Sequence, residues 1–276
     1  MGLDMVTTMR AMESLFAFWA DAGVSHAFED SPVDRTATPV AALKKAPLAA
    51  PATGGTNTNP VNAVGVPAPP PIDNALARHH ASAAQDLAAL EAAIEAFDGC
   101  PLKTAGARRS VFSRGASDAP IMIVGEAPGA DEDAAGQPFV GRAGKLLDRM
   151  LGAARLSEHV FITNTVFWRP PGNRNPTAAE QLACLPFVER AIALVKPQIL
   201  VFVGGVAAKS MLRREEGILA LRGRWFEWTS SNGEMSIPAL PTLHPAFLLR
   251  QPAAKKKAWE DLLTLAERVD RPTRSA

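Results

Sequence analysis

The sequence predicts an α/β protein, a three-layer α/β/α sandwich around a central, mostly parallel four-stranded sheet. From about residue 121 onward, short apolar segments alternate with helical patterns, and this alternation favours a parallel sheet covered on both faces. The chain has 276 residues, 47% of them hydrophobic, which is enough for one sizeable core with extensions. The stretch 121–150 organises the prediction, because it combines a buried strand, a loop rich in Gly, Pro and acids, and a helix.

The first 80 residues differ from the rest in composition. Within residues 1–30, an amphipathic helix is expected, whose apolar stripe of Met12, Leu15, Phe16 and Trp19 predicts packing on the parent domain or docking onto a protein partner. Residues 31–80 are expected to be a disordered Ala/Pro-rich linker, since nine of the 23 prolines fall within 31–72. The folded domain is therefore predicted over 81–270.

The elements of this domain can be placed in order. Residues 82–98 suit a helix that ends at Gly99. Strands are predicted over 121–125, 160–166, 199–203 and 239–243, and helices over 142–153, 177–195, 205–213 and 255–268. Residues 225–237 are typical of an inserted hairpin with its turn at Asn232 and Gly233.

Charge and cysteine content limit the classes of function. Residues 1–99 hold 5 basic and 11 acidic side chains, whereas residues 100–276 hold 24 basic and 17 acidic ones, so a polyanionic partner suits the second part. Two cysteines are too few for a disulfide framework and fit a reducing compartment. We expect a cytoplasmic protein, because no apolar run is long enough to span a bilayer and the N-terminus lacks a signal peptide's apolar centre.

Polar residues follow three of the predicted strands. Glu126, Asn164 and His244 each stand at a strand's carboxyl end, and in a parallel sheet these ends share one edge, where ligands bind. Each residue alone has an ordinary structural explanation, but together they predict a site. The loop after the first strand matches no nucleotide-binding fingerprint, and its acids Asp131, Glu132 and Asp133 would repel a nucleotide's phosphates.

Three separated motifs resemble the uracil-DNA glycosylase superfamily, most closely its family-four type from bacteria and archaea. They read GEAPGADEDAAGQPFVGRAG, FITNTVFWRPPGNRNP and LHPAFLLRQPAAKKKAWEDL, and the resemblance covers about residues 84–268. It implies a monofunctional glycosylase of base-excision repair that flips uracil out of DNA and hydrolyses its glycosidic bond, leaving an abasic site.

The resemblance also implies roles for the site residues. Phe139 matches the aromatic residue on which the flipped uracil stacks, and Asn164 matches the amide that reads its edge. His244 matches the histidine that binds uracil O2, where negative charge develops. Glu126 and Glu132 match acidic positions near the sugar and the attacking water, and the sequence does not decide between them. The backbone of Ala127 is expected at the uracil edge.

Uracil-containing DNA is the partner that the resemblance implies, and the protein is expected to be a monomer. Leu249 and Arg250 match the loop that enters the minor groove. Candidates for phosphate contact are Arg142, Lys145, Arg169, Arg174, Arg250, Lys255 and Lys256, with Lys257 in the same run. A solvated helix start explains the lysine run equally simply.

The chain departs from the family at its iron–sulfur ligands. The family holds a [4Fe–4S] cluster with four cysteines, and here only Cys100 and Cys184 remain, with Lys103 and Trp168 at the other two positions. We therefore expect no cluster and no other cofactor or metal, with Trp168 and the stem of Lys103 filling the site and the two thiols close together.

Two alternatives stay open at this point. One is a glycosylase for another deaminated base, because the width of the pocket around Ala127 and Glu132 is not fixed by the sequence. The other is a non-catalytic DNA-damage binder or scaffold, which the lost ligands and the N-terminal segment would suit. A substrate panel and a binding assay distinguish these from uracil excision.

Overall fold

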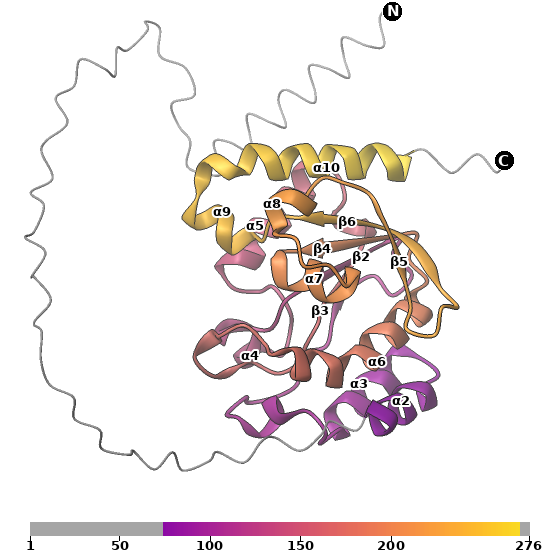
Figure 1. Cartoon of the computed structure of the whole chain (residues 1–276). Coiled ribbons are helices and arrows are strands. Elements are labelled where there is room, and N and C mark those ends of the chain that lie inside the picture. The colour runs from indigo at the N-terminus through magenta and orange to yellow at the C-terminus, as the bar shows by residue number, and fades with distance from the viewer. Residues whose placement is uncertain (1–73, 271–276) are drawn as a thin grey trace, which may run out of the picture.

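A computed structural model describes residues 74–270 of the chain (Figure 1). The helix expected within 1–30 and the first part of the expected linker, residues 31–73, lie outside the described residues. The α-helices are α2 Asn74–Ala83, α3 Leu87–Ala96, α4 Ala130–Ala135, α5 Arg142–Ala153, α6 Ala178–Val195, α7 Gly205–Leu212, α8 Ile218–Leu221, α9 Pro245–Arg250 and α10 Lys255–Asp270. The strands are β1 Arg114–Gly115, β2 Ile121–Gly125, β3 Val160–Asn164, β4 Ile199–Val203, β5 Phe226–Thr229 and β6 Ser236–Thr242.

The sheet has a parallel centre and two antiparallel edges. Its order is β1-β3-β2-β4-β6-β5, and β3, β2, β4 and β6 pair in parallel as predicted. The described sheet has six strands, so the prediction of four is wrong at the edges, where β1 and β5 pair antiparallel. At two residues, β1 is too short to produce a periodic pattern, and β5 is the first arm of the predicted hairpin.

Helices cover both faces of the sheet, as Figure 1 shows. Side chains along the central strands alternate between two apolar clusters, as the twofold period of a strand requires. Met122 and Val124 join the cluster with α2, α3 and α6, whereas Ile121 and Ile123 join the cluster with α5 and α10. The three-layer architecture is confirmed.

The N-terminal boundary of the domain lies earlier than predicted. The single helix expected over 82–98 is instead two helices, because Asp86 caps the start of α3 by accepting a hydrogen bond from the Ala89 N–H at 2.8 Å. α2 lies partly inside the predicted linker, and its Ala77 and Ala81 are buried. The linker prediction is therefore wrong over residues 74–80.

The strand predicted over 160–166 ends two residues sooner. After Asn164 the chain turns away: the Thr165 N–H donates to the Gly125 carbonyl at 2.9 Å, and its hydroxyl donates to the Glu126 carbonyl at 2.7 Å. These bonds join the carboxyl ends of β2 and β3, which carry two of the predicted site residues. Among residues 74–270, no helix is long and apolar enough to cross a membrane.

Candidate active site

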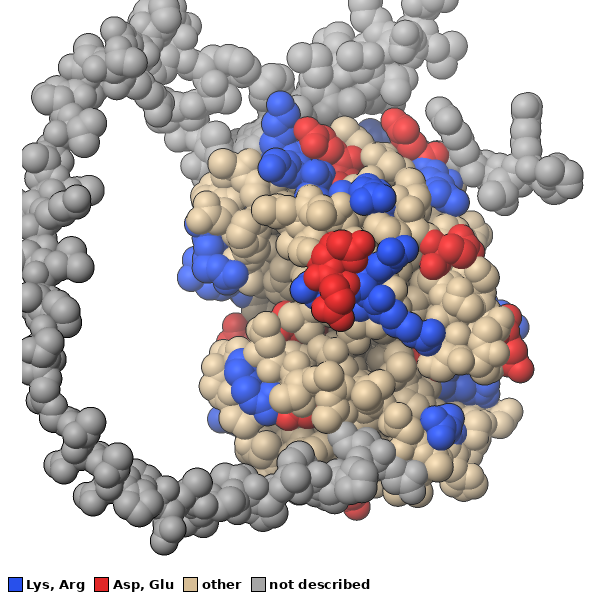
Figure 2. All heavy atoms as spheres, viewed as in Figure 1, with Lys and Arg blue, Asp and Glu red and all other residues tan. Residues whose placement is uncertain are grey.

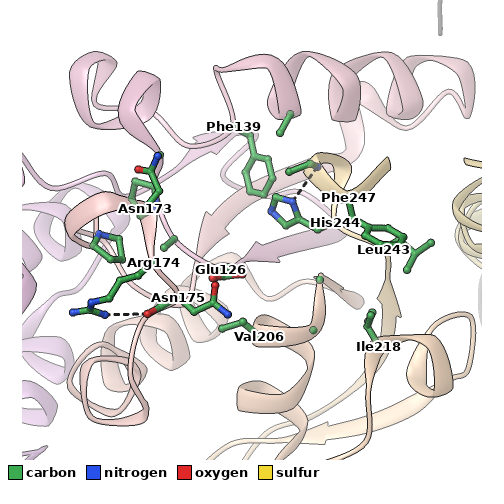
Figure 3. Close-up of a pocket in the computed structure, with 18 of the residues that line it drawn as sticks. Glu126, Phe139, Asn173, Arg174, Asn175, Val206, Ile218, Leu243, His244 and Phe247 are labelled. Carbon is green, nitrogen blue, oxygen red and sulfur yellow. Dashed lines mark hydrogen bonds between the residues drawn. The ribbon is translucent and has the colours of Figure 1, made fainter. Parts of the chain in front are cut away.

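A cavity of about 850 Å³ opens at the carboxyl ends of the parallel strands. The loops after β2, β3, β4 and β6 all contribute to its wall, as expected for a parallel sheet. Figure 3 shows the rings of Phe139 and His244 close together on one part of the wall, with Glu126 and Val206 on another. Of the residues predicted from sequence, the lining includes Glu126, Ala127, Glu132, Phe139, Arg174, His244 and Arg250.

Phe139 occupies a backbone conformation that side chains rarely adopt. Its φ is +56°, in the left-handed region, which costs on the order of 1–3 kcal/mol for a residue other than glycine. Its carbonyl packs so closely on α5 that a Cβ added at Gly144 would lie 1.7 Å from the Phe139 oxygen. Phe139 is 6% exposed, and the centroid of its ring lies 5.7 Å from that of His244 at an interplanar angle of 31°.

The carboxylate of Glu132 is fully engaged by the backbone of the loop. One oxygen accepts from the Val140 N–H at 3.0 Å and the Gly141 N–H at 2.9 Å, and the other accepts from the Gly129 N–H at 3.0 Å. Glu132 therefore ties the start of α4 to the start of α5. This role fixes the loop's shape and leaves no carboxylate oxygen unengaged.

Glu126 contrasts with Glu132. Its half-buried side chain lines the cavity, and within residues 74–270 its carboxylate accepts no hydrogen bond and forms no ion pair. Burial raises the pKa of this carboxyl group above its ordinary value, because desolvation disfavours the charged form. Of the two acids, Glu126 is the one whose carboxylate is free to hold a water molecule.

His244 caps the N-terminus of α9 with its ring. The Ala246 N–H donates to Nδ1 at 3.1 Å, so the proton of the neutral imidazole is on Nε2. Burial, with a smaller contribution from Arg250, lowers the pKa of His244 to about 4. At neutral pH the ring is therefore an uncharged hydrogen-bond donor at the cavity wall.

Asn164 ends β3 directly beside this group. It is 1% exposed, and its Oδ1 has no hydrogen-bond partner among the described residues. A Cβ added at Gly125 would lie 2.5 Å from this oxygen and 2.5 Å from Phe139 Cζ, so only glycine lets the amide and the ring approach. A buried acceptor without a partner is costly, and a ligand donor would satisfy it.

The predicted DNA-contacting residues divide by exposure. Arg142, Lys145 and Lys256 are exposed, and Leu249 is 37% exposed beside the exposed Arg250. Lys255, at 4% exposure, is buried at the start of α10, and this burial disfavours the predicted contact with phosphate. Figure 2 shows Lys and Arg side chains on the viewed face in separate groups, interspersed with acidic ones, and not in one continuous surface.

Two predicted arginines of the loop after β3 have protein partners. Arg174 forms a bidentate ion pair with the buried Glu180, with N–O distances of 2.8 and 2.6 Å. Burial opposes ionisation of Glu180, but Arg174 and Thr177 outweigh it and lower the pKa of that carboxyl group. The Nε of Arg169 donates to Asn173 Oδ1 at 2.7 Å. Both arginines therefore shape the loop.

Several lining residues were not predicted from the sequence. Asn173 and Asn175 come from the loop after β3, Val206 from α7, and Ile218 from α8 (Figure 3). The turn-forming run from Pro170 to Pro176 was the available signal for the two asparagines. Val206 and Ile218 are ordinary apolar residues, so no sequence signal separates them from the core.

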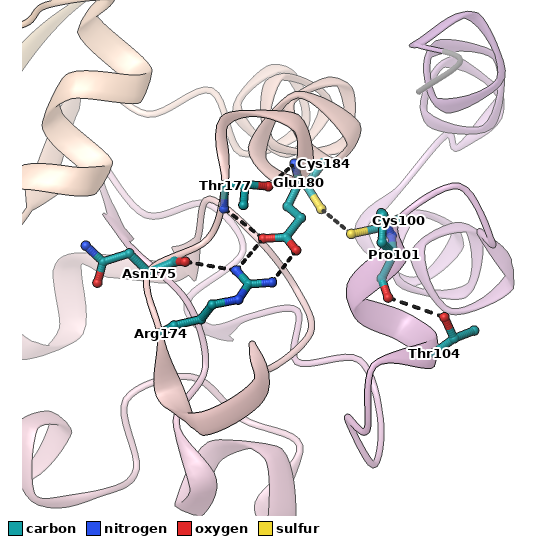
Figure 4. A network of polar contacts seen from close by, with 8 residues as sticks. All are labelled: Cys100, Pro101, Thr104, Arg174, Asn175, Thr177, Glu180 and Cys184. Carbon is teal, nitrogen blue, oxygen red and sulfur yellow. Dashed lines mark hydrogen bonds and ion pairs between the residues drawn. The ribbon is translucent and has the colours of Figure 1, made fainter. Parts of the chain in front are cut away.

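The two cysteines meet beside α6, where Cys184 lies one helical turn after Glu180. The Cys184 thiol donates to Cys100 Sγ at 3.9 Å, a contact that Figure 4 shows beside the pair of Arg174 and Glu180. Both cysteines are buried. The hydrogen bond from Cys184 lowers the pKa of Cys100. The pKa of Cys184 is raised mainly by its burial and to a smaller extent by the same hydrogen bond. The predicted closeness of the thiols is confirmed.

The resemblance places the other two cluster ligands at Trp168 and Lys103, and neither side chain is a cluster ligand. Trp168 is 2% exposed in the same apolar cluster as the thiols, and Lys103 Nζ donates to the Glu95 carbonyl at 2.5 Å and to Asp98 at 2.7 Å. Within residues 74–270, no group of three or more His, Cys, Asp or Glu side chains could hold a metal ion. The residues present do not fit a [4Fe–4S] cluster, which takes four ligands.

Fold and cavity together define an α/β protein with a site for a flat, uncharged, hydrogen-bonding ring, since the cavity wall offers an aromatic face and a neutral donor, and the unpaired Oδ1 of Asn164, which is not itself part of the wall, lies beside Phe139. The family model of the uracil DNA glycosylase superfamily matches residues 112–263. The chain belongs to this superfamily.

Its relatives include several type-4 uracil-DNA glycosylases. That of Saccharolobus solfataricus is 40% identical over 168 residues, which cover 58% of this chain and 76% of that protein. That of Pyrobaculum aerophilum is 38% identical over 182 residues, 64% of this chain and 91% of that protein. That of Thermotoga maritima is 38% identical over 153 residues, 55% of this chain and 77% of that protein.

Proposed function

We propose that this protein is a DNA glycosylase that flips uracil out of DNA and hydrolyses the bond between the base and deoxyribose, leaving an abasic site. The single observation that carries the proposal is the convergence of Phe139, Asn164 and His244 at one end of the parallel sheet. The names of the relatives support uracil as the base.

Base recognition follows from the donors and acceptors of this group. The unpaired Asn164 Oδ1 accepts the N3–H of uracil, and the amide nitrogen donates to O4. Cytosine presents the opposite pattern at these positions, so the same amide leaves buried polar groups unpaired and rejects it. Phe139 supplies the stacking face, and the backbone of Ala127 borders the base edge.

Bond cleavage uses a neutral donor and a carboxylate. As the glycosidic bond breaks, negative charge develops on uracil O2, and the Nε2–H of His244 donates to it, which stabilises the transition state more than the ground state. The Glu126 carboxylate holds and orients the attacking water and offsets positive charge on the sugar. Glu132 acts through the loop that it holds.

DNA binding is assigned to the exposed residues beside the cavity. Leu249 and Arg250 enter the duplex near the flipped nucleotide; their exposure at the end of α9 and the position of Arg250 in the cavity wall support this role. Arg142, Lys145 and Lys256 contribute contacts to the phosphates.

We also propose that the chain folds and acts without an iron–sulfur cluster. The touching thiols of Cys100 and Cys184 and the buried Trp168 support this, because packed side chains replace a metal cross-link there. Iron and acid-labile sulfide assays on anaerobically purified protein check it, and stoichiometric amounts of both would contradict the proposal.

The function is tested with oligonucleotides that each contain one candidate base. After incubation and alkali treatment, the uracil strand should break at the uracil, while thymine, cytosine, hypoxanthine and xanthine strands stay intact. Cleavage at a deaminated purine but not at uracil would favour the alternative base specificity. Salt-dependent binding without any product would favour a non-catalytic role.

A further inference from the structure

We propose that Arg114 is a positioning residue of the site, whose guanidinium holds the strained backbone at Phe139 so that the ring faces the flipped base. The inference rests on the proposed function and adds a residue that lies outside all three motifs. Arg114 belongs to β1, the two-residue edge strand.

The guanidinium of Arg114 connects three elements. Its Nε donates to the Pro138 carbonyl at 2.8 Å, and its Nη2 donates to the Phe139 carbonyl at 3.2 Å. The same Nη2 donates to Asp148 of α5 at 2.6 Å. The Arg114 side chain is only 25% exposed, so these bonds are partly shielded from water.

Opposite charges hold the two sides of the same backbone segment. The Arg114 guanidinium donates hydrogen bonds to the carbonyls of Pro138 and Phe139, while the Glu132 carboxylate accepts hydrogen bonds from the N–H groups of Val140 and Gly141. Phe139 lies between these two contacts, at φ +56°. A strained conformation persists only where its surroundings fix it, and here both polar sides of the peptide chain are fixed.

The chemistry of arginine suits this role. A planar guanidinium presents several donors in a rigid fork, so it can bind two carbonyls and a carboxylate at once. A lysine ammonium keeps the charge but has no such fork. Arg114→Lys should therefore rescue only part of what Arg114→Ala loses.

The position of the Phe139 ring controls where the base lies. The ring packs near His244 and beside the Asn164 amide, so a shift of the backbone moves the stacking face relative to both hydrogen-bonding groups. A displacement of about 1 Å can cost on the order of 10²-fold in rate. Contacts with the DNA backbone involve other residues, so duplex affinity should not change.

The experiment compares Arg114→Ala, Arg114→Lys and Arg109→Ala. Arg109 is a matched control, because it is exposed beside the same loop, next to Gly136, and donates no hydrogen bond to Pro138 or Phe139 in the described structure. Single-turnover excision of uracil, the Kd for the uracil duplex and the melting temperature are measured for each variant.

We expect Arg114→Ala to excise uracil roughly 10-fold to 100-fold more slowly, with duplex Kd within about twofold of wild type. Arg114→Lys should fall between the two, and Arg109→Ala should match wild type. An Arg114→Ala rate equal to wild type overturns the proposal. So does a loss of rate matched by an equal loss of duplex affinity, which would make Arg114 a phosphate contact.

Two further measurements keep the inference separate from folding and from the proposed function. If Arg114→Ala does not fold, Arg114→Lys, which keeps the positive charge but cannot bind both carbonyls through a fork, should still slow excision at unchanged Kd, and a wild-type rate for it contradicts the inference. If wild type releases no uracil, the proposed function fails. In that case amide hydrogen exchange tests whether Arg114 holds this backbone. Faster exchange at Val140 and Gly141 in Arg114→Ala than in Arg109→Ala supports the inference, and equal exchange overturns it.

Discussion

Acidification should destabilise the protein through His244, and replacing this residue by asparagine should remove that sensitivity. Burial holds the pKa of His244 near 4, whereas the unfolded chain titrates at the ordinary value of 6.5. Between these values the unfolded state binds more protons, so folding stability falls as the pH falls. His244→Asn keeps an acceptor for the Ala246 N–H and has no titratable group.

The magnitude follows from the two pKa values. At about pH 5.5, roughly nine in ten unfolded molecules have a protonated residue 244, while the folded ring is still neutral, which lowers the free energy of unfolding by about 1.2 kcal/mol relative to neutral pH. This value barely depends on the folded pKa as long as that pKa is about 5 or lower. At about pH 4.5 the loss reaches roughly 2.5 kcal/mol.

The assay is urea unfolding of both proteins at neutral pH and at about pH 5.5. The difference in unfolding free energy between wild type and His244→Asn should shrink by about 1.2 kcal/mol on acidification. Nitrogen chemical shifts of the imidazole should show the proton on Nε2 at neutral pH. A constant difference between the two proteins, or a His244 that titrates near its ordinary value, would refute the assignment of a buried neutral donor.

Three further predictions concern other residues of the site. His244→Ala and Asn164→Ala should each lower the single-turnover rate by on the order of 10²-fold with duplex Kd nearly unchanged, as rate and binding assays check. A variant that loses duplex affinity as much as it loses rate would contradict the role given to that residue. Glu126→Gln should slow excision by at least about 10²-fold at unchanged stability, and it should remove the fall in rate at acidic pH, whose midpoint in wild type lies above the ordinary carboxyl pKa. Glu132→Ala should instead lower the free energy of unfolding in urea by about 2 kcal/mol, and the reverse pattern for the two variants would exchange their roles. Lys256→Ala should reduce the slope of log DNA affinity against log salt concentration by about 1 with unchanged stability. Lys255→Ala should instead lower the melting temperature, and the same salt slope and melting temperature for both variants would count against the burial of Lys255.

The sequence predicted the central strands and the edge at which Glu126, Asn164 and His244 meet. These predictions were possible because buried parallel strands are continuous apolar runs, and residues that follow them must share one edge of the sheet. The left-handed backbone of Phe139 was not predictable, because it depends on the close packing of its carbonyl on Gly144 in the folded loop and on a hydrogen bond from Arg114, which is distant in sequence.

The division of labour between similar residues also required the structure. Glu126 and Glu132 lie in one acidic loop, and only the positions of the backbone N–H groups show that Glu132 is fully engaged. Lys255 and Lys256 are adjacent and chemically identical, yet the orientation of α10 buries the first and exposes the second. A sequence records charge but not the direction in which a side chain points.

The most direct test of uracil excision is the release of the free base. The full chain is incubated with an oligonucleotide that contains a single uracil, and free uracil and alkali-labile sites are quantified together. The proposed function predicts one free uracil for every abasic site, and no release from matched thymine or cytosine strands. Folded protein that releases no uracil from either single-stranded or double-stranded DNA would contradict it.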